Sequence, residues 1–207
     1  MQPVSKTIKL PRKNGRSLVL RNGSPKPFQW TVKQYYKMAD LGYFQGRRVE
    51  LINGEIIEMA PMKSPHAVAI TLLVEVLSEK FGERFSVRSQ LPLRLDEKSE
   101  PEPDIAIVKG KARDYSESHP NHASLIVEVS NSTLRFDRGE KAGLYAQFGI
   151  ADYWILNLKD RCLEVCREPS SDDGIFFYAE RFVVDSGSEI SPLAKPKTKI
   201  MVADILP

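Results

Sequence analysis

The chain has 207 residues, of which 42% are apolar and 28% are charged, and this composition is typical of a globular protein. No apolar run is long enough for a transmembrane helix and the N-terminus lacks the apolar core of a secretory signal, so we expect a cytoplasmic protein that does not enter a membrane. Two cysteines, Cys162 and Cys166, exclude a disulfide scaffold, and without neighbouring ligands they make a poor zinc site.

Positive charge is concentrated at the N-terminus. Residues 1–27 contain seven basic side chains and no acidic one, although the net charge of the whole chain is only +3. This pattern predicts a basic, loosely structured arm over 1–27 that is able to contact phosphates, followed by a folded domain over 28–207. The alternative is a solubilising tail. The basic residues of the arm are Lys6, Lys9, Arg12, Lys13, Arg16, Arg21 and Lys26.

The folded part is predicted to begin with a short helix and a hairpin. Thr31 and Gln34 have the spacing of a capping box, so we expect a helix from this point to about Leu41. Asn53-Gly54 between two strand-like runs is the strongest short-range signal for a β-hairpin. The two runs are 47–52 and 55–59.

A second helix is predicted from Ser64, as the N-cap, and Pro65, as the first helical residue. Its apolar residues recur at helical spacing, which indicates one buried face. They are Ile70, Leu73, Val74, Leu77 and Phe81. Strand-like runs then follow at 85–90, 91–95, 104–108 and 124–129.

A third helix is predicted from Asp137, with Glu140 as its capping-box partner, to about Phe148, where Gly149 ends it. Strands and helices follow one another without a regular βαβ repeat. The sequence therefore predicts a mixed α/β fold, with a mixed sheet flanked by helices. The last predicted strands are 153–158, 161–167 and 175–184.

One carboxylate interrupts an otherwise apolar strand. The run Leu125-Ile126-Val127-Glu128-Val129 is apolar on both faces except at Glu128, which is typical of an interior strand covered on both sides. A buried carboxylate requires a cation or hydrogen-bond donors, so we interpret Glu128 as functional. The alternative is that Glu128 reaches solvent at the end of the strand.

Two further residues break the local pattern. Asp104 stands at the start of an apolar strand, although aspartate commonly opens strands after a turn. Lys141 lies on the apolar face of the third predicted helix and should point toward the sheet, unless its ammonium extends to solvent. Two carboxylates and a lysine at one end of a sheet suit metal-assisted phosphodiester hydrolysis. In this scheme Asp104 and Glu128 hold Mg²⁺, and Lys141 orients the attacking water or stabilises the transition state.

Pro103-Asp104, followed by Glu128-Val129-Ser130, resembles the motif of the PD-(D/E)XK nuclease superfamily. A wider set of motifs is similar to a large bacterial group described as restriction endonucleases, formerly a domain of unknown function. The likeness spans about 28–207. Its motifs are Arg48–Glu55, Ser64–His66, Glu128–Thr133, Asp137–Lys141, Tyr145 and Gly149–Ile155.

The resemblance implies a restriction-endonuclease-like core, to which the N-terminal helix and hairpin are additions. It also implies a DNA endonuclease that depends on Mg²⁺ or Mn²⁺, with Asp104 and Glu128 as metal ligands and the backbone carbonyl of Val129 as a further one. The sequence departs from the superfamily motif at Ser130, where the motif has lysine. Similar groups carry this lysine on the following helix, and Lys141 fits that position.

Three more residues match positions typical of the group. The likeness suggests Glu50 as a further carboxylate of the site, although a carboxylate beside a hairpin usually faces solvent. Gln90 is suited to order a water or a phosphate, or is an ordinary polar strand residue. We interpret His66 as a packing histidine rather than a metal ligand.

Two other functions stay open. Ser130 at the lysine position and the modest net charge favour a non-catalytic nucleic-acid-binding or assembly module on the same fold. The apolar late hairpin and the C-terminal segment favour a subunit interface. A homodimer is compatible with a nuclease that cuts both DNA strands.

Overall fold

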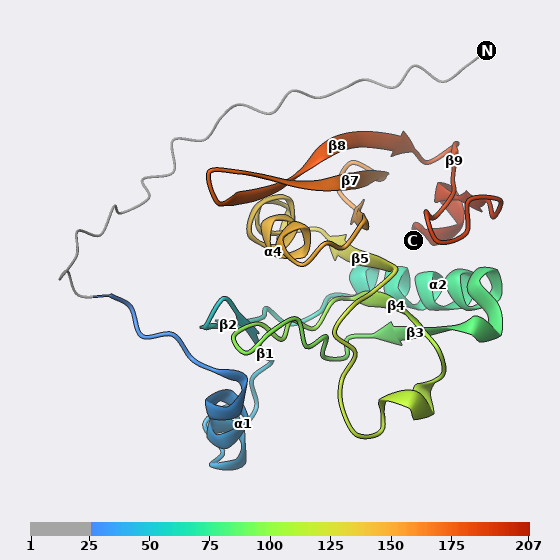
Figure 1. Ribbon diagram of the computed structural model, residues 1–207. Coiled ribbons are helices and arrows are strands. Elements are labelled where there is room, and N and C mark those ends of the chain that lie inside the picture. The colour runs from blue at the N-terminus through green and yellow to red at the C-terminus, as the bar shows by residue number, and fades with distance from the viewer. Residues whose placement is uncertain (1–25) are drawn as a thin grey trace.

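The computed structural model describes residues 26–207, and a six-stranded sheet forms their centre (Figure 1). The strand order is β3-β4-β5-β6-β7-β8; β5 and β6 are parallel, and the other neighbours are antiparallel. The mixed α/β fold predicted from the sequence is confirmed. The strands are β3 (Phe85–Ser89), β4 (Ile105–Lys109), β5 (Leu125–Ser130), β6 (Asp152–Asn157), β7 (Cys162–Asp172) and β8 (Ile175–Asp185).

Helices cover both faces of this sheet. Helix α2 (Ser64–Phe81) buries Leu73 and Leu77 in the same apolar cluster as Val127 of β5. Helix α4 (Ala142–Gln147) belongs to a second cluster, which contains Ile126 of β5. Because successive strand residues point to opposite faces, the side chain of Glu128 lies on the face that α4 covers.

The N-terminal helix and hairpin form as predicted. Helix α1 (Val32–Asp40) has the capping box of Thr31 with Gln34. Strands β1 (Val49–Ile52) and β2 (Glu55–Glu58) are joined at Asn53-Gly54, where both residues adopt positive φ as a two-residue hairpin turn requires. The hydroxyl of Tyr35 in α1 donates to the carbonyl of Val49 at 2.8 Å, which fixes the helix against β1.

The crossover from β5 to β6 differs from the prediction. It begins with the helical turn α3 (Leu134–Phe136), continues as a π-helical turn over Asp137–Lys141 and ends as α4. The predicted capping box at Asp137 and Glu140 is wrong, because Asp137 already has helical dihedrals. Its side chain instead accepts a hydrogen bond from the hydroxyl of Thr133 at 2.7 Å.

Two other local predictions are wrong. The segment 91–95 is not a strand, because Gln90 adopts φ +52° and turns the chain out of β3. Ser64 is the first residue of α2 rather than its cap, since Lys63 occupies the N-cap position without a side-chain hydrogen bond. The late hairpin forms as predicted, with longer strands.

The C-terminal segment contains a further, small sheet. A small antiparallel pair, β9 (Glu189–Ile190) and β10 (Ile200–Met201), follows β8. The predicted basic arm lies outside the described residues, apart from Lys26 and Pro27. Among residues 26–207, no helix has the length and apolar character needed to cross a membrane.

Candidate active site

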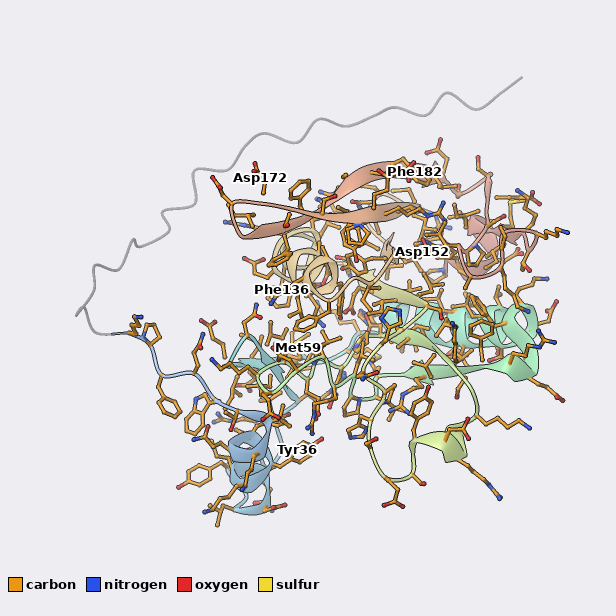
Figure 2. All side chains as sticks on the ribbon, viewed as in Figure 1. Tyr36, Met59, Phe136, Asp152, Asp172 and Phe182 are labelled. Atoms are coloured by element: carbon orange, nitrogen blue, oxygen red, sulfur yellow. The ribbon has the colours of Figure 1, made fainter. Side chains whose placement is uncertain are left out.

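A cleft of about 380 Å³ opens where the N-terminal hairpin meets the adjoining ends of β4 and β5. Met59, on the segment that follows β2, lines one wall (Figure 2). All five side chains that the sequence singled out for the site line this cleft. They are Glu50, Gln90, Asp104, Glu128 and Lys141.

The pairing of β4 with β5 brings the two central carboxylates together. Ile105 pairs with Val127, so Asp104 stands opposite Glu128 at the end of the ladder. Two hydrogen bonds link these strand ends. The backbone N–H of Asp104 donates to Oε2 of Glu128 at 3.2 Å, and the N–H of Val129 donates to Oδ2 of Asp104 at 2.9 Å.

The ammonium of Lys141 lies between two buried carboxylates. Its Nζ donates to Oε1 of Glu128 at 3.0 Å and forms an ion pair with Oε2 of Glu50 at 2.8 Å, without hydrogen-bond geometry to that atom. Lys141 is 1% exposed and Glu50 is 2% exposed. The alternatives of a lysine that extends to solvent and a solvent-facing Glu50 are therefore wrong.

Burial and charge set the ionisation of this cluster. Burial raises the pKa of Glu128 to about 8, although the nearby Lys141 acts in the opposite direction. Burial alone would lower the pKa of Lys141, but Glu128 and Glu50 raise it well above its usual value. The pKa of Asp104 is lowered, because hydrogen bonds from His66, Val129 and Gln90 outweigh its burial.

Gln90 and His66 both contact Asp104. The amide nitrogen of Gln90 donates to Oδ1 of Asp104 at 3.1 Å, and Nε2 of His66 lies 3.1 Å from the same oxygen. The φ of +52° at Gln90 is costly for a residue with a side chain, by about 1–3 kcal/mol. His66 lines the cleft, and its interpretation as a packing histidine rather than a metal ligand stays a prediction. Gln90 lies just beyond β3 and is not an ordinary strand residue.

Sequence reasoning assigned no role to two residues that the structure places here. The hydroxyl of Tyr145 donates to Oε1 of Glu128 at 2.7 Å. Asp137 is buried and lines the cleft, and burial raises its pKa. Both lie one turn from Lys141 on the same helix, so the apolar stripe that revealed Lys141 was the signal that could have found them.

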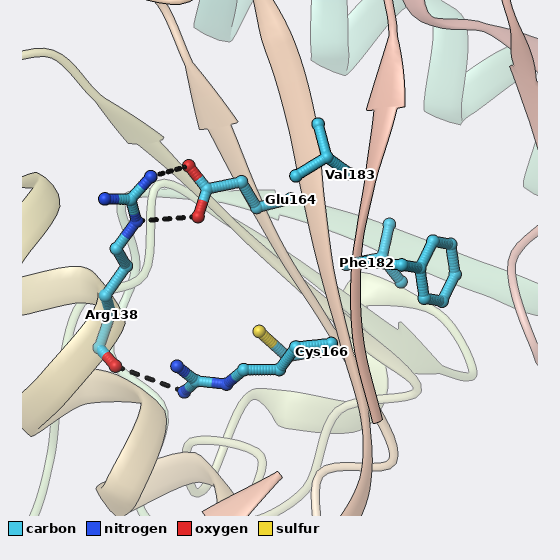
Figure 3. A pocket seen from close by; sticks show the side chains of 7 residues that line it. Arg138, Glu164, Cys166, Phe182 and Val183 are labelled. Atoms are coloured by element: carbon cyan, nitrogen blue, oxygen red, sulfur yellow. Dashed lines mark hydrogen bonds and ion pairs between the residues drawn. The ribbon is translucent and has the colours of Figure 1, made fainter. Parts of the chain in front are cut away.

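The π-helical turn that carries Lys141 is fixed from outside the cleft. Figure 3 shows the guanidinium of Arg138 forming two bonds to Glu164 of β7, at 2.6 and 2.7 Å. The carbonyl of Arg138 accepts from Arg181 of β8 at 3.1 Å, and the carbonyl of Asp137 accepts from the hydroxyl of Tyr153 at 3.0 Å. A cavity of about 120 Å³ lies beside these residues. Arg138 and Glu164 pair with each other and Arg181 donates to a backbone carbonyl, so we assign this cavity no role.

The chain is similar to known proteins in sequence and in fold. A family described as "Putative restriction endonuclease" (Uma2) matches residues 32–201. The chain belongs to the Uma2 family. Its fold is also similar to the crystal structure of a "putative nuclease belonging to DUF820" from Anabaena variabilis ATCC 29413, with a TM-score of 0.64. That match has 15% sequence identity and covers 84% of this chain and 96% of the other. A search of curated proteins found no match.

Restriction-endonuclease-like families generally use a divalent metal, and the donor atoms in the cleft of this Uma2 protein decide whether one fits here. Residues 26–207 contain no cluster of three or more metal-binding side chains, so a metal here would depend on two carboxylates, backbone and water. Oδ2 of Asp104 and Oε2 of Glu128 each accept one hydrogen bond. Each oxygen therefore keeps a free acceptor direction.

The backbone supports a third ligand. The N–H of Val129 points toward Asp104, whereas the carbonyl of Ser130 accepts from Leu158 on the β6 side at 2.9 Å. Because successive carbonyls of a strand point to opposite edges, the carbonyl of Val129 faces Asp104. Mg²⁺ commonly binds through one or two carboxylates and keeps several waters, so this donor set fits Mg²⁺ or Mn²⁺.

Proposed function

We propose that this protein is a divalent-metal-dependent DNA endonuclease that hydrolyses phosphodiester bonds in the cleft. The observation that carries the proposal is the ion pair between the buried ammonium of Lys141 and Glu128, which stands opposite Asp104 on the neighbouring strand. Two acids and an amine that are distant in the sequence thus line one cleft. The family supports a nuclease, and the chemistry of the cleft supports this reaction.

In this proposal Asp104, Glu128 and the carbonyl of Val129 hold Mg²⁺ or Mn²⁺. A bound divalent metal supplies an activated water and positive charge at the phosphate. Gln90 and His66 occupy Oδ1 of Asp104, which leaves Oδ2 for ligand binding. Lys141 uses one of its three N–H donors on Glu128. A remaining donor orients the attacking water or stabilises charge on the phosphate.

The test compares the wild-type protein with Asp104→Asn and Lys141→Ala on plasmid DNA. We expect cleavage by the wild-type protein with Mg²⁺ or Mn²⁺ and none with EDTA. Each variant should lose roughly 100-fold or more in rate, because each removes a charge that contacts the reacting groups. Lys159→Ala, an exposed lysine beyond β6, is the matched control and should retain activity. Equal cleavage by all four proteins would reveal a contaminating nuclease and would contradict the proposal.

A non-catalytic nucleic-acid-binding module is the second candidate. Ser130 at the usual lysine position and the pairing of Lys141 with two carboxylates favour it. This alternative predicts DNA binding that needs no metal and falls steeply with salt. Salt-sensitive binding in EDTA, together with no cleavage under any metal condition, would favour it over the endonuclease.

A homodimer is part of the proposal, because nucleases that cut both strands often pair two sites and a two-fold dimer supplies them. Its support is the long edge strand β8, in which Ile175, Phe176 and Phe177 are exposed. Light scattering at working concentration is expected to give twice the mass of the chain. A monomer under these conditions would count against this part.

A further inference from the structure

Two donors from one helix converge on a single oxygen of Glu128. Nζ of Lys141 lies 3.0 Å from Oε1, and the hydroxyl of Tyr145 lies 2.7 Å from the same atom. The two donors are one helical turn apart and therefore project from the same face. Since a carboxylate oxygen has two lone pairs, these two bonds saturate Oε1.

The other oxygen is arranged differently. Oε2 of Glu128 accepts one bond, from the backbone N–H of Asp104 at 3.2 Å. One acceptor direction of Oε2 is therefore free, at the carboxylate pair that lines the cleft. A glutamate side chain rotates easily about its terminal bonds unless its oxygens are held. The two donors on Oε1 thus decide which oxygen faces a ligand.

Tyr145 is itself held firmly. It is fully buried, at 0% exposure, and its ring meets that of Tyr153 edge-on with 5.0 Å between centroids. The hydroxyl of Tyr153 in turn donates to the carbonyl of Asp137, in the turn that carries Lys141. The position of the Tyr145 hydroxyl is therefore set by the same packing that sets Lys141.

We propose that Tyr145 is a positioning residue of this site, whose hydroxyl fixes Oε1 of Glu128 so that Oε2 is presented to a divalent cation. The inference rests on the proposed function. Tyr145 acts only through Glu128. Hydrogen bonds that orient a metal-binding carboxylate typically contribute 10- to 100-fold to metal affinity or activity.

The test is Tyr145→Phe, which removes the hydroxyl and keeps the ring. Tyr178→Phe is the matched control, because Tyr178 is also a buried tyrosine, and its hydroxyl donates to the carbonyl of Ile150 at 2.7 Å. Each variant removes one hydrogen bond to a buried acceptor, so both should lower the melting temperature of the metal-free protein. Only Tyr145→Phe should weaken Mn²⁺ binding by calorimetry, by about 10- to 100-fold.

Kinetics give a second measurement. At a fixed, limiting Mn²⁺ concentration, Tyr145→Phe should lower kcat and leave the KM for DNA unchanged, because the DNA contacts are intact. Substitution of Tyr145 by 4-aminophenylalanine keeps a donor at this position and should restore most of the Mn²⁺ affinity. This variant also tests the inference should Tyr145→Phe fail to fold.

Three results would overturn the inference. They are wild-type Mn²⁺ affinity in Tyr145→Phe, an equal loss of affinity in Tyr178→Phe, and no recovery with the amino analogue. If the wild-type protein binds Mn²⁺ and cleaves DNA while any of these results holds, only the role of Tyr145 fails. If the wild-type protein neither binds Mn²⁺ nor cleaves DNA, the proposed function fails and the inference fails with it.

Discussion

At the scale of single residues, charge balance governs the cleft. One buried cation, Lys141, lies between two buried carboxylates, those of Glu50 and Glu128. If both acids were ionised, one buried negative charge would have no positive partner, which is costly. A buried carboxylic acid avoids this cost by keeping its proton. This explains why burial raises the pKa of Glu128 to about 8 despite its contact with Lys141.

This raised pKa predicts how stability depends on pH. The pKa of Glu128 is about 8 in the folded protein, against an ordinary value of 4.5. Between these values the folded state holds a proton that the unfolded state has lost. The free energy of unfolding therefore falls as the pH rises, by up to about 1.4 kcal/mol per pH unit from this group. Glu128→Gln should abolish this part of the decline.

Urea unfolding in EDTA, at several pH values across that window, provides the measurement. Glu140→Gln changes an exposed glutamate on the same helical segment and should leave the slope unchanged. A Glu128→Gln protein whose stability declines with pH as steeply as that of the wild type would contradict this assignment of the proton.

At the scale of elements, α2 packs against the part of the sheet whose strand ends carry Asp104 and Glu128. It is 18 residues long, and its buried face packs on the side of β4 and β5 opposite the cleft. Helical stability in such a position comes mainly from packing of the apolar face rather than from intrinsic propensity. The cleft therefore depends on α2 even though most of the helix lies away from it.

Leu73→Ala tests this dependence. Leu73 is fully buried, so its truncation should lower the free energy of unfolding by about 2–5 kcal/mol, through lost burial and the cavity left behind. Val68→Ala, at a position that is 44% exposed on the same helix, should cost less than about 0.5 kcal/mol. Urea denaturation measures both. Similar losses for the two variants would mean that α2 is not packed as described.

At the scale of the whole molecule, charge is segregated along the chain. Residues 1–25 carry basic side chains and no acidic one, while the net charge of the complete chain is only +3. The cleft itself is rich in carboxylates. Its acidic side chains, Glu50, Glu102, Asp104, Glu128 and Asp137, outnumber its basic ones, Arg48, Lys63 and Lys141. We therefore expect a separate source of positive charge to assist DNA binding.

Removal of residues 1–25 should therefore weaken DNA binding and reduce its salt dependence. Six basic residues are lost, and each phosphate contact contributes roughly 0.9 to the slope of log K against log salt. Fluorescence anisotropy over a salt series in Ca²⁺ or EDTA gives the slope. The double substitution Lys197→Gln and Lys199→Gln, at exposed positions, should leave it unchanged. Undiminished affinity after the deletion would rule out the arm as the contact surface.

The sequence by itself determined the features that depend on near neighbours. The capping box of α1, the Asn53-Gly54 turn and the two faces of β5 each follow from residues a few positions apart. The inward direction of Lys141 was likewise visible in the helical stripe. For the same reason the early start of the third helix was missed, because Asp137 has a capping partner by spacing but lies inside a helix that begins at Leu134.

Only the tertiary structure decided which distant groups meet. The β4–β5 register sets Asp104 opposite Glu128, and the N-terminal hairpin brings Glu50 to Lys141. The strained turn at Gln90 and the hydroxyl of Tyr145 also reach these carboxylates through the packed core. Local sequence patterns record which face of an element is buried. They do not record the order and register of strands, and it is these that set distances between residues far apart in the chain.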